Sequence, residues 1–324
     1  MHVYDYTPML LEGKMKKIFI DGRAGTTGLK IYDRLNQRSD IELIVLSEEE
    51  RKDTESRKRA LNQADIAFLC LPDAAAVEAV TLINNPNTVV IDTSTAHRTI
   101  EGWAYGFPEL SKAHEENIRS SKHIAVPGCH ASGFIALVYP LIKADILPMD
   151  ALLTCHSLTG YSGGGKKMIA AYEFADRDPL LAAPRQYGLT QQHKHLKEMK
   201  AITGIETDPL FFPIVSNFYS GMEVTVPLFA QQLKSGAAAE DIKEIYKNQY
   251  TNGLVQYCEN LDQDGFLSAA TLSGKDNMKV AVLGNRDRIL LTAIYDNLGK
   301  GASGAALECL NIVTGQEKSF GLDI

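Results

Sequence analysis

The feature that most constrains the fold of this chain is a strand–turn–helix unit near its start. An apolar run ending at Ile20 precedes three glycines, and apolar residues then recur at helical spacing up to Leu35. Glycines let the backbone turn tightly and approach a pyrophosphate, whose charge the free N–H groups of a helix N-terminus stabilise. Although the spacing is GxxGxxG instead of the more common GxGxxG, this unit predicts a dinucleotide site at Gly22, Gly25 and Gly28.

Further apolar runs alternate with helix-forming stretches after this unit. They cover residues 41–46, 64–72, 88–92 and 123–126. This alternation predicts an α/β fold with a doubly wound parallel sheet of the Rossmann type. Ligands of such sheets bind beyond the carboxyl ends of the strands, so functional residues are expected in the loops that follow these runs.

The residues after the second predicted strand bear on the type of dinucleotide. In NAD-binding proteins an acidic residue commonly follows this strand and contacts the ribose 2′-hydroxyl. Here Ser47 comes first, with Arg51 and Lys52 nearby, and this set favours the extra 2′-phosphate of NADP. Glu48 argues the other way, and residues 48–53 are equally compatible with a solvated helix start. The choice between NADP and NAD therefore stays open on these residues.

Two polar side chains follow the predicted strand at 88–92. Ser94 and Arg98 lie in the loop at its carboxyl end. An arginine in this place can bind an anionic group through two parallel hydrogen bonds. The alternative is that Arg98 forms an ordinary ion pair on the surface.

The segment "AVPGCHASGF" places a cysteine at a strand–turn–helix junction. Cys129 follows a Pro-Gly turn and precedes an apolar stretch that reads as a helix. The free N–H groups and the dipole of a helix N-terminus favour the thiolate, which is the reactive form of cysteine. The same N–H groups can stabilise an oxyanion on a carbonyl under attack. The position predicts a nucleophile, and the alternative is a small packing residue.

A cysteine nucleophile requires an acid or base, most often a histidine. Two of the eight histidines lie in the segment "QHKHLKEM" at 192–199. We expect Thr190 to cap a helix here, with His195 on its apolar face together with Met199. His195 is the favoured acid/base. His193, and a purely structural role for His195, remain the alternatives.

A second glycine-rich loop occupies residues 158–167. Its three consecutive glycines end at Gly165 and are followed by Lys166 and Lys167. The GxxxxGK[ST] spacing of a P-loop is absent. The loop is compatible with closing over a cofactor or an anionic substrate, and also with a simple mobile connection.

Composition excludes several other classes of protein. The formal net charge is -7 without a block of Lys and Arg, which argues against nucleic acid as a partner. No apolar run approaches the roughly 20 residues that span a bilayer. The five cysteines are widely spaced without a CxxC pair, so neither a disulfide framework nor a metal site is predicted. Reduced thiols predict a cytoplasmic location. Residues 1–14 are interpreted as a loose leader or a cloning remnant.

Several segments together resemble one enzyme family. They are "KIFIDGRAGTTGL" (17–29), "DTSTAHR" (92–98), "YGFPEL" (105–110), "VPGCHASGF" (126–134), "GYSGGGKK" (160–167), "QHKHLKEM" (192–199), "GMEVTVPLF" (221–229) and the final stretch at 296–312. They are similar to the corresponding segments of N-acetyl-gamma-glutamyl-phosphate reductase in its shorter form. The likeness runs from about Met15 to the C-terminus.

This resemblance implies a role for each candidate residue. Cys129 would be the nucleophile that forms a thioester, and His195, ahead of His193, would be the acid/base. Arg98 would bind the departing phosphate, with Ser94 beside it. The residues implied on the NADP(H) side are Gly22, Gly25, Thr26, Thr27, Gly28, Ser47, Gly163, Gly164 and Asn297.

The resemblance also implies an activity and an architecture. The reaction would be the NADPH-dependent reduction of N-acetyl-gamma-glutamyl phosphate to N-acetylglutamate semialdehyde in arginine biosynthesis, by a homodimer or homotetramer. The dinucleotide-binding domain would comprise residues 15–130 and about 299–324, and an α+β domain for catalysis and oligomerisation residues 131–298. Alternation and β-branched content predict strands of this second domain at 221–230, 278–285 and 288–297.

Three alternatives compete with this function. Aspartate-semialdehyde dehydrogenase has the same architecture and the same thioester mechanism. A cysteine hydrolase or acyltransferase would use Cys129 and His195 without a dinucleotide. A non-catalytic nucleotide-binding module would use neither. His130 stands where longer relatives commonly carry tyrosine, and Lys197 replaces a proline of the histidine segment. No role for His130 is indicated by the sequence.

Overall fold

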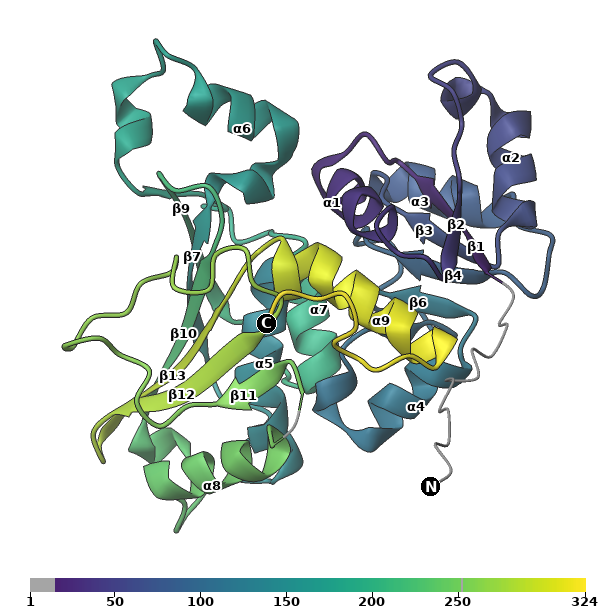
Figure 1. Cartoon of the computed structure of the whole chain (residues 1–324). Helices are drawn as coiled ribbons and strands as arrows, with labels where there is room; N and C mark the ends of the chain where they lie inside the picture. The colour runs from purple at the N-terminus through teal and green to yellow at the C-terminus, as the bar shows by residue number, and fades with distance from the viewer. Residues whose placement is uncertain (1–14, 252) are drawn as a thin grey trace, which may run out of the picture.

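The computed structural model describes residues 15–251 and 253–324, so the predicted leader at 1–14 lies outside the described residues. The chain forms two sheets with helices packed against them (Figure 1). The first is a six-stranded parallel sheet in the order β2-β1-β3-β4-β6-β5. Its strands are β1 (Lys16–Asp21), β2 (Ile41–Ile44), β3 (Ile66–Leu69), β4 (Val89–Asp92), β5 (Ala104–Tyr105) and β6 (His123–Ala125).

Side chains of this sheet alternate between two apolar clusters. Ile18 and Ile20 of β1 belong to the cluster with α1, α4 and α9, whereas Phe19 belongs to the cluster with α2 and α3. Both faces are therefore covered, and the predicted doubly wound fold is confirmed. The helices are α1 (Thr26–Leu35), α2 (Thr54–Gln63), α3 (Asp73–Thr81), α4 (Lys112–Ser120) and, from the end of the chain, α9 (Gly304–Thr314).

The second sheet is mixed and has seven strands in the order β11-β12-β13-β10-β7-β9-β8. Its pairs are antiparallel except for β11 with β12 and β7 with β9. The three predicted strands are confirmed as β10, β12 and β13. The strands are β7 (Thr154–Gly160), β8 (Arg185–Gln186), β9 (Leu210–Ser216), β10 (Met222–Phe229), β11 (Val255–Tyr257), β12 (Met278–Gly284) and β13 (Arg288–Tyr295).

Helix α5 (Cys129–Lys143) lies between the two sheets and fixes the position of the predicted nucleophile. It is apolar all round and packs against β10 and β13 on one side and α7 (His195–Thr203) on another. The hydroxyls of Tyr246 in α8 (Ala239–Gln249) and of Tyr250, the residue that follows this helix, donate to its carbonyl oxygens. Because α5 is buried on all sides, its place in the core is fixed by packing, and so is that of its first residue, Cys129.

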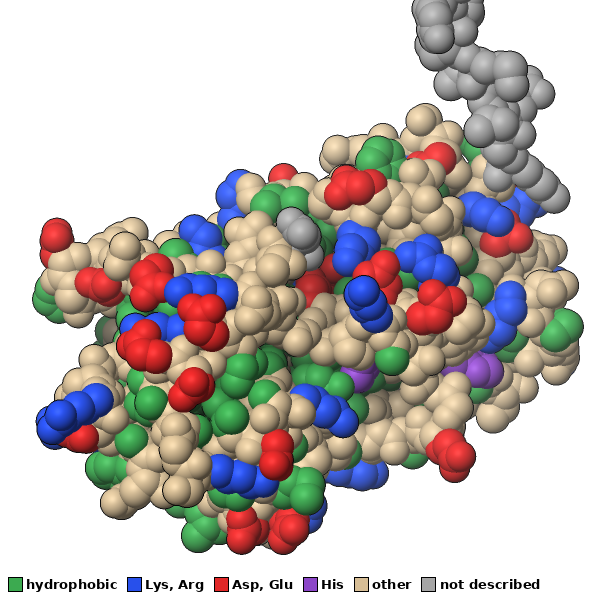
Figure 2. Space-filling model, turned by 90° about the horizontal axis from the view of Figure 1, so that it is seen from below, with side chains coloured by type: hydrophobic (Ala, Val, Ile, Leu, Met, Phe, Trp, Pro, Cys, Tyr) green, Lys and Arg blue, Asp and Glu red, His purple; other side chains and the backbone are tan. Residues whose placement is uncertain are grey.

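The remaining helical segments are short or lie at the periphery. Helix α6 (Gly165–Glu173) projects from the second sheet (Figure 1). Short turns of helix occur at Glu50–Lys52 (η1), Pro108–Leu110 (η2), Tyr161–Gly164 (η3), Pro179–Ala182 (η4), Ala230–Gln232 (η5) and, as a π-helix, Gly299–Ser303 (η6). Within the described ranges, no helix is long and apolar enough to cross a membrane. Figure 2 shows basic and acidic side chains interspersed over one face of the molecule.

Candidate active site

A cavity of about 580 Å³ lies between the two sheets, at the carboxyl ends of the parallel strands. Both glycine-rich loops, the cysteine segment and the histidine segment line it. Of the residues predicted from the sequence, the cavity is lined by Gly25, Thr26, Thr27, Gly28, Ser94, Arg98, Cys129, Gly163, Gly164, His193, His195 and Asn297. Gly22 and Ser47 do not line it.

In the first glycine loop, two glycines allow close backbone contacts and a third faces the cavity. Gly22 has φ of 86°, and a Cβ there would lie 2.2 Å from the Cys70 carbonyl oxygen. A Cβ at Gly28 would lie 2.6 Å from the Gly22 carbonyl oxygen. These two glycines are thus required for contact between strands and helix, whereas Gly25 begins α1 at the cavity wall. Buried Thr26 Oγ1 has no hydrogen-bond partner among the described residues, so this cradle fits the pyrophosphate of a dinucleotide.

Ser47, after the end of β2, forms hydrogen bonds with the following turn. Its Oγ accepts a hydrogen bond from the Glu50 N–H at 3.2 Å, and its own N–H donates to the Glu50 carboxylate at 2.8 Å. Arg23, stacked over Tyr32, and Arg51 line a second, smaller cavity beside β1 and β2. Arg51 Nε is buried without a partner in the part of the chain that the structure describes.

Cys129 is the first residue of α5, as the sequence predicts. The Tyr295 hydroxyl donates to its carbonyl oxygen at 2.5 Å, and Gly301 packs against its side chain from behind. Burial raises the pKa of the Cys129 thiol, although Arg98 and the His130 N–H act in the opposite direction. The N–H at the helix start thus favours the thiolate as expected, but burial has the larger effect and the net pKa is raised.

His195 is buried at the start of α7. Lys194 stands at the N-cap, so the predicted cap at Thr190 is wrong; Gln191 has φ of 56°, which breaks the helix before it. Burial, and next the Arg98 charge, keep the pKa of His195 well below its usual range. The imidazole is thus neutral at neutral pH, and its Nδ1 has no hydrogen-bond partner within the described residues. Its backbone N–H donates to His193 Nδ1 at 3.2 Å.

Arg98 is buried, not on the surface. Its Nε donates to the Val126 carbonyl at 2.8 Å, Nη2 to the Thr93 carbonyl at 3.1 Å, and Nη1 to Glu198 at 2.9 Å. The alternative of a surface ion pair is therefore wrong. A guanidinium has five N–H donors, and these three bonds leave two of them free for a ligand. Ser94 stabilises the same loop, since its N–H and hydroxyl both donate to Asp92.

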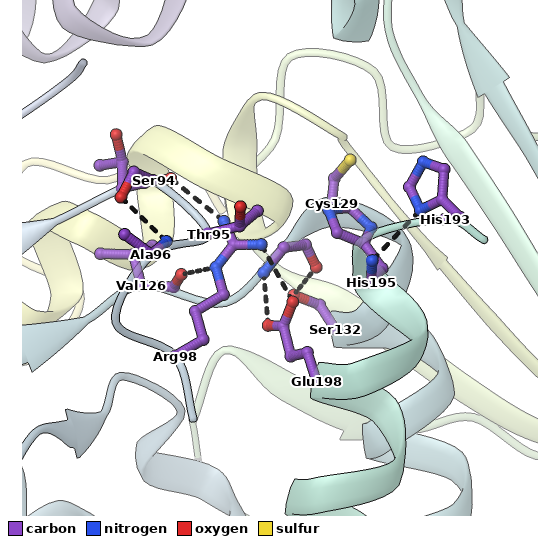
Figure 3. A network of polar contacts seen from close by, with 12 residues as sticks. Ser94, Thr95, Ala96, Arg98, Val126, Cys129, Ser132, His193, His195 and Glu198 are labelled. Carbon is purple, nitrogen blue, oxygen red and sulfur yellow. Dashed lines mark hydrogen bonds and ion pairs between the residues drawn. The ribbon is translucent and has the colours of Figure 1, made fainter. Parts of the chain in front are cut away.

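Glu198 is a functional residue that the sequence analysis missed. Its carboxylate accepts from Arg98 (Figure 3), from the Gly128 N–H at 2.8 Å and from the Tyr105 hydroxyl at 2.8 Å. It thereby ties the Arg98 loop and the turn before Cys129 to helix α7. The available signal was its spacing of three residues from His195, which puts both on one helix face.

The second glycine loop is braced from the end of β13. Asn297 Nδ2 donates to Ser162 Oγ at 3.0 Å, and its Oδ1 accepts from the Gly221 N–H at 2.9 Å. A Cβ at Gly163 would lie 3.4 Å from the Asn297 amide. Asn297 therefore uses its amide to hold the loop at the cavity wall, while Gly163 and Gly164 remain accessible.

His130 lines the cavity next to Cys129, but both of its ring nitrogens have partners within the protein. Its Nδ1 lies 2.6 Å from Ser157 Oγ, and its Nε2 lies 2.6 Å from the hydroxyl of Tyr187. Burial lowers the pKa of His130 to about 3, so the ring is neutral. Tyr187 and Lys194 line the cavity, and no sequence pattern singled them out.

Comparisons with known proteins agree with this geometry. The family "Semialdehyde dehydrogenase, NAD binding domain" matches residues 17–118, and "Semialdehyde dehydrogenase, dimerisation domain" matches residues 129–297. N-acetyl-gamma-glutamyl-phosphate reductase 2 of Nostoc sp. is 44% identical, with 94% of this chain and 99% of the relative covered. The N-acetyl-gamma-glutamyl-phosphate reductase of Rhizobium meliloti is 45% identical, with 92% and 98% covered.

Solved structures share the fold at low identity. Aspartate semialdehyde dehydrogenase II of Vibrio cholerae has a TM-score of 0.71 at 16% identity, covering 94% of this chain and 99% of that one. The enzyme of Candida albicans, solved with NADP, has a TM-score of 0.63 at 14% identity, covering 93% and 98%. The resemblance found in the sequence is confirmed: the chain belongs to the N-acetyl-gamma-glutamyl-phosphate reductase family, and its two parts are those of a semialdehyde dehydrogenase.

Proposed function

We propose that this protein reduces N-acetyl-gamma-glutamyl phosphate to N-acetylglutamate semialdehyde, with NADPH as reductant and release of phosphate. The observation that carries the proposal is that Cys129 and His195 lie side by side (Figure 3) and line the same cavity as the first glycine loop, which fits a dinucleotide. A hydrolase or acyltransferase has no use for the cradle, and a nucleotide-binding module has no use for the cysteine and histidine. The names of the curated relatives support the same reaction.

The pKa directions define the first step. Because the Cys129 thiol and the His195 imidazole are both neutral before substrate binds, attack requires transfer of the thiol proton to His195. The thiolate then bonds to the acyl carbon, the carbon–oxygen bond to phosphate breaks, and a thioester remains. The first N–H groups of α5 have no intrahelical acceptor and stabilise the oxyanion during this step.

The second step reduces the thioester. NADPH, when bound along the Gly25 side of the cavity, supplies the hydride. Collapse of the thiohemiacetal then breaks the carbon–sulfur bond and releases the semialdehyde, while His195 returns its proton to the sulfur of Cys129. The cavity places both glycine loops beside Cys129, as this step requires.

The phosphate needs cationic partners at the cavity wall. Arg98 retains two unused N–H donors there, and Lys194 is an exposed cation on the same wall. We expect Lys194→Gln to raise the KM for phosphate in the reverse reaction about fivefold, with little change in kcat. Lys197→Gln on the same helix, outside the cavity, is the control. Equal phosphate KM values for the two variants would contradict this role.

The discriminating experiment compares two acyl phosphates. NADPH oxidation is measured with N-acetyl-gamma-glutamyl phosphate and with aspartyl phosphate. The proposal expects turnover of the first and negligible turnover of the second. The reverse preference would establish the aspartate-semialdehyde dehydrogenase alternative, and failure to bind NADPH would favour a hydrolase.

We also propose that the protein is a homodimer or homotetramer assembled through its second sheet. The face of this sheet opposite α5 carries His156 stacked on Phe212, and exposed Leu210 and Phe229 nearby. Exposed apolar side chains on a sheet face mark an interaction surface, and the matching family is described as a dimerisation domain.

Phe212→Asp is expected to dissociate the oligomer, because it places an unpaired charge in a desolvated interface. Sedimentation velocity at micromolar concentration would show the mass of one chain. Val77→Asp, at a half-exposed apolar position on α3, is the matched control. A monomeric wild type, or an unchanged mass for Phe212→Asp, would contradict the assignment.

We propose the domain division at about residues 130 and 299, supported by the packing of α9 in the apolar cluster of the first sheet. A cytoplasmic location is supported by the free thiols of the cysteines at 70, 129, 155, 258 and 309.

A further inference from the structure

The buried hydrogen bonds of His130 show which group is the donor and which the acceptor along the series Ser157, His130 and Tyr187. Ser157 is fully buried on β7, and His130 Nδ1 is its only side-chain hydrogen-bond partner among the described residues. A hydroxyl carries one proton, and leaving it unsatisfied in the interior is costly. Ser157 therefore donates to His130 Nδ1. Because a neutral imidazole has one donor and one acceptor nitrogen, Nε2 carries the ring proton.

This direction continues to the cavity wall. His130 Nε2 donates to the oxygen of Tyr187, which has no other hydrogen-bond partner within the described chain. The phenolic proton of Tyr187 is thus left without a protein acceptor, and Tyr187 lines the cavity. The order Ser157, His130, Tyr187 delivers one neutral donor, polarised by two preceding hydrogen bonds, beside the nucleophile.

The carboxylates around the cavity restrict what this donor can face. Asp73 is the one acidic side chain among the described lining residues, and it accepts hydrogen bonds from the Thr95 N–H and hydroxyl on the wall of the first sheet. Tyr187 follows β8 on the wall of the second sheet. The described lining on the Tyr187 side therefore includes no carboxylate to pair with an ammonium group, whereas a neutral acceptor group needs none.

From these contacts we propose that the Tyr187 hydroxyl, oriented by His130 and Ser157, donates a hydrogen bond to the carbonyl oxygen of the substrate's acylated amine. This inference rests on the proposed function and adds the residues that select an N-acyl amino acid over a free one. An amide carbonyl accepts the Tyr187 proton, whereas a free ammonium group has no lone pair to accept it. Tyr187 is then a binding residue. Ser157 and His130 are positioning residues, because the Ser157 hydroxyl and both His130 ring nitrogens are engaged within this network.

The test compares two aldehydes that differ only in the acetamido group. Phosphate-dependent reduction of NADP is measured with N-acetylglutamate semialdehyde and with 5-oxopentanoate. Tyr187→Phe is expected to raise the KM for the acetylated aldehyde about tenfold, leave that for 5-oxopentanoate within about twofold, and change kcat little. Tyr172→Phe is the matched control, because its hydroxyl is buried, lacks a partner in the described chain and lies outside the cavity.

Ser157→Ala tests the direction of the network without altering the cavity wall. Loss of the Ser157 proton frees Nδ1 to take the ring proton, so that Nε2 accepts the Tyr187 proton and withdraws it from the cavity. We expect the variant to lower discrimination between the two aldehydes in the same sense as Tyr187→Phe. Long-range ¹⁵N NMR of labelled histidine is expected to show His130 with its proton on Nε2 in the wild type and on Nδ1 in Ser157→Ala.

Several outcomes would overturn the assignment. An equal loss of kcat for both aldehydes in Tyr187→Phe would mean that the hydroxyl serves the reacting oxygen. Unchanged discrimination, or a wild-type His130 with its proton on Nδ1, would also contradict it. A wild-type protein that is inactive on the acetylated aldehyde contradicts the proposed function itself, whereas an active wild type with unaltered variants contradicts only the role of Tyr187.

Discussion

Cys129→Ser is expected to lower kcat for acyl phosphate reduction by about 10⁴-fold or more. A serine hydroxyl is a far weaker nucleophile than a thiol at neutral pH, and its ester accepts hydride less readily than a thioester. The neutral His195 beside it can remove the proton of a thiol. It removes the proton of a serine hydroxyl far less readily, because the pKa of the hydroxyl is much higher. The rate is measured as NADPH oxidation under saturating N-acetyl-gamma-glutamyl phosphate.

Cys70 provides a matched control in the same cavity. It also lines the wall, but burial raises its pKa to about 12 and it lies on the dinucleotide side. Cys70→Ser is expected to retain activity within a few-fold. A Cys129→Ser enzyme with near wild-type turnover would rule out the covalent mechanism, whatever the behaviour of Cys70→Ser.

His195→Asn is expected to lower kcat by a factor on the order of 10²–10⁴, the usual contribution of a positioned general acid or base. The asparagine keeps a polar group of similar size, so helix α7 and the Glu198 contacts are preserved. His193→Asn is the matched control at the neighbouring imidazole, and its expected loss is less than about tenfold. Comparable losses for the two variants would leave the acid/base role unassigned to His195.

The pH dependence of kcat/KM offers an independent check on His195. Its pKa is lowered by burial and Arg98, so the reactive neutral form exists above that lowered value and is lost as the pH falls through it. The ordinary pKa of histidine is about 6.5. We therefore expect kcat/KM of the wild type to fall on the acid side at a pH below about 6.5. An acid limb centred at or above 6.5 that disappears in His195→Asn would contradict the neutral pair.

The first sheet was predictable from sequence because its signals are local. The glycine turn, the apolar run before it and the helical spacing after it lie within one short segment, and β3, β4 and β6 lie in continuous, largely apolar runs. Half-buried β2 was predicted as well, whereas the two-residue strand β5 was not. The alternating strands at 221–230, 278–285 and 288–297 were predictable for the same reason. Cys129 was placed at a helix start by its Pro-Gly turn, and the structure agrees.

What the sequence did not reveal depends on contacts between distant segments. Glu198 meets Gly128 across 70 residues, and Tyr187 meets His130 across 57. No periodicity encodes such pairs. The helix start at Cys129 was predictable because it is a local property, whereas the burial that raises the pKa of its thiol comes from the whole fold.

The same limit applies to Arg98 and to the start of α7. Arg98 is buried and hydrogen-bonded to Glu198 and to two carbonyl groups, one of them in the segment just before Cys129. Residues 92–98 alone cannot indicate these partners. Thr190 has the right chemistry for a cap, but the left-handed conformation of Gln191 delays the helix to His195. Propensity identified the helix and tertiary context set its first turn.

The covalent intermediate is the most direct test of the account. The protein is mixed with N-acetyl-gamma-glutamyl phosphate in the absence of NADPH, quenched in acid, and analysed by intact and peptide mass spectrometry. The account predicts one N-acetylglutamyl group per chain, on the peptide that contains Cys129, and its loss when NADPH is added before the quench. Absence of the adduct in an enzyme that turns over, or its attachment to a different residue, would contradict the mechanism.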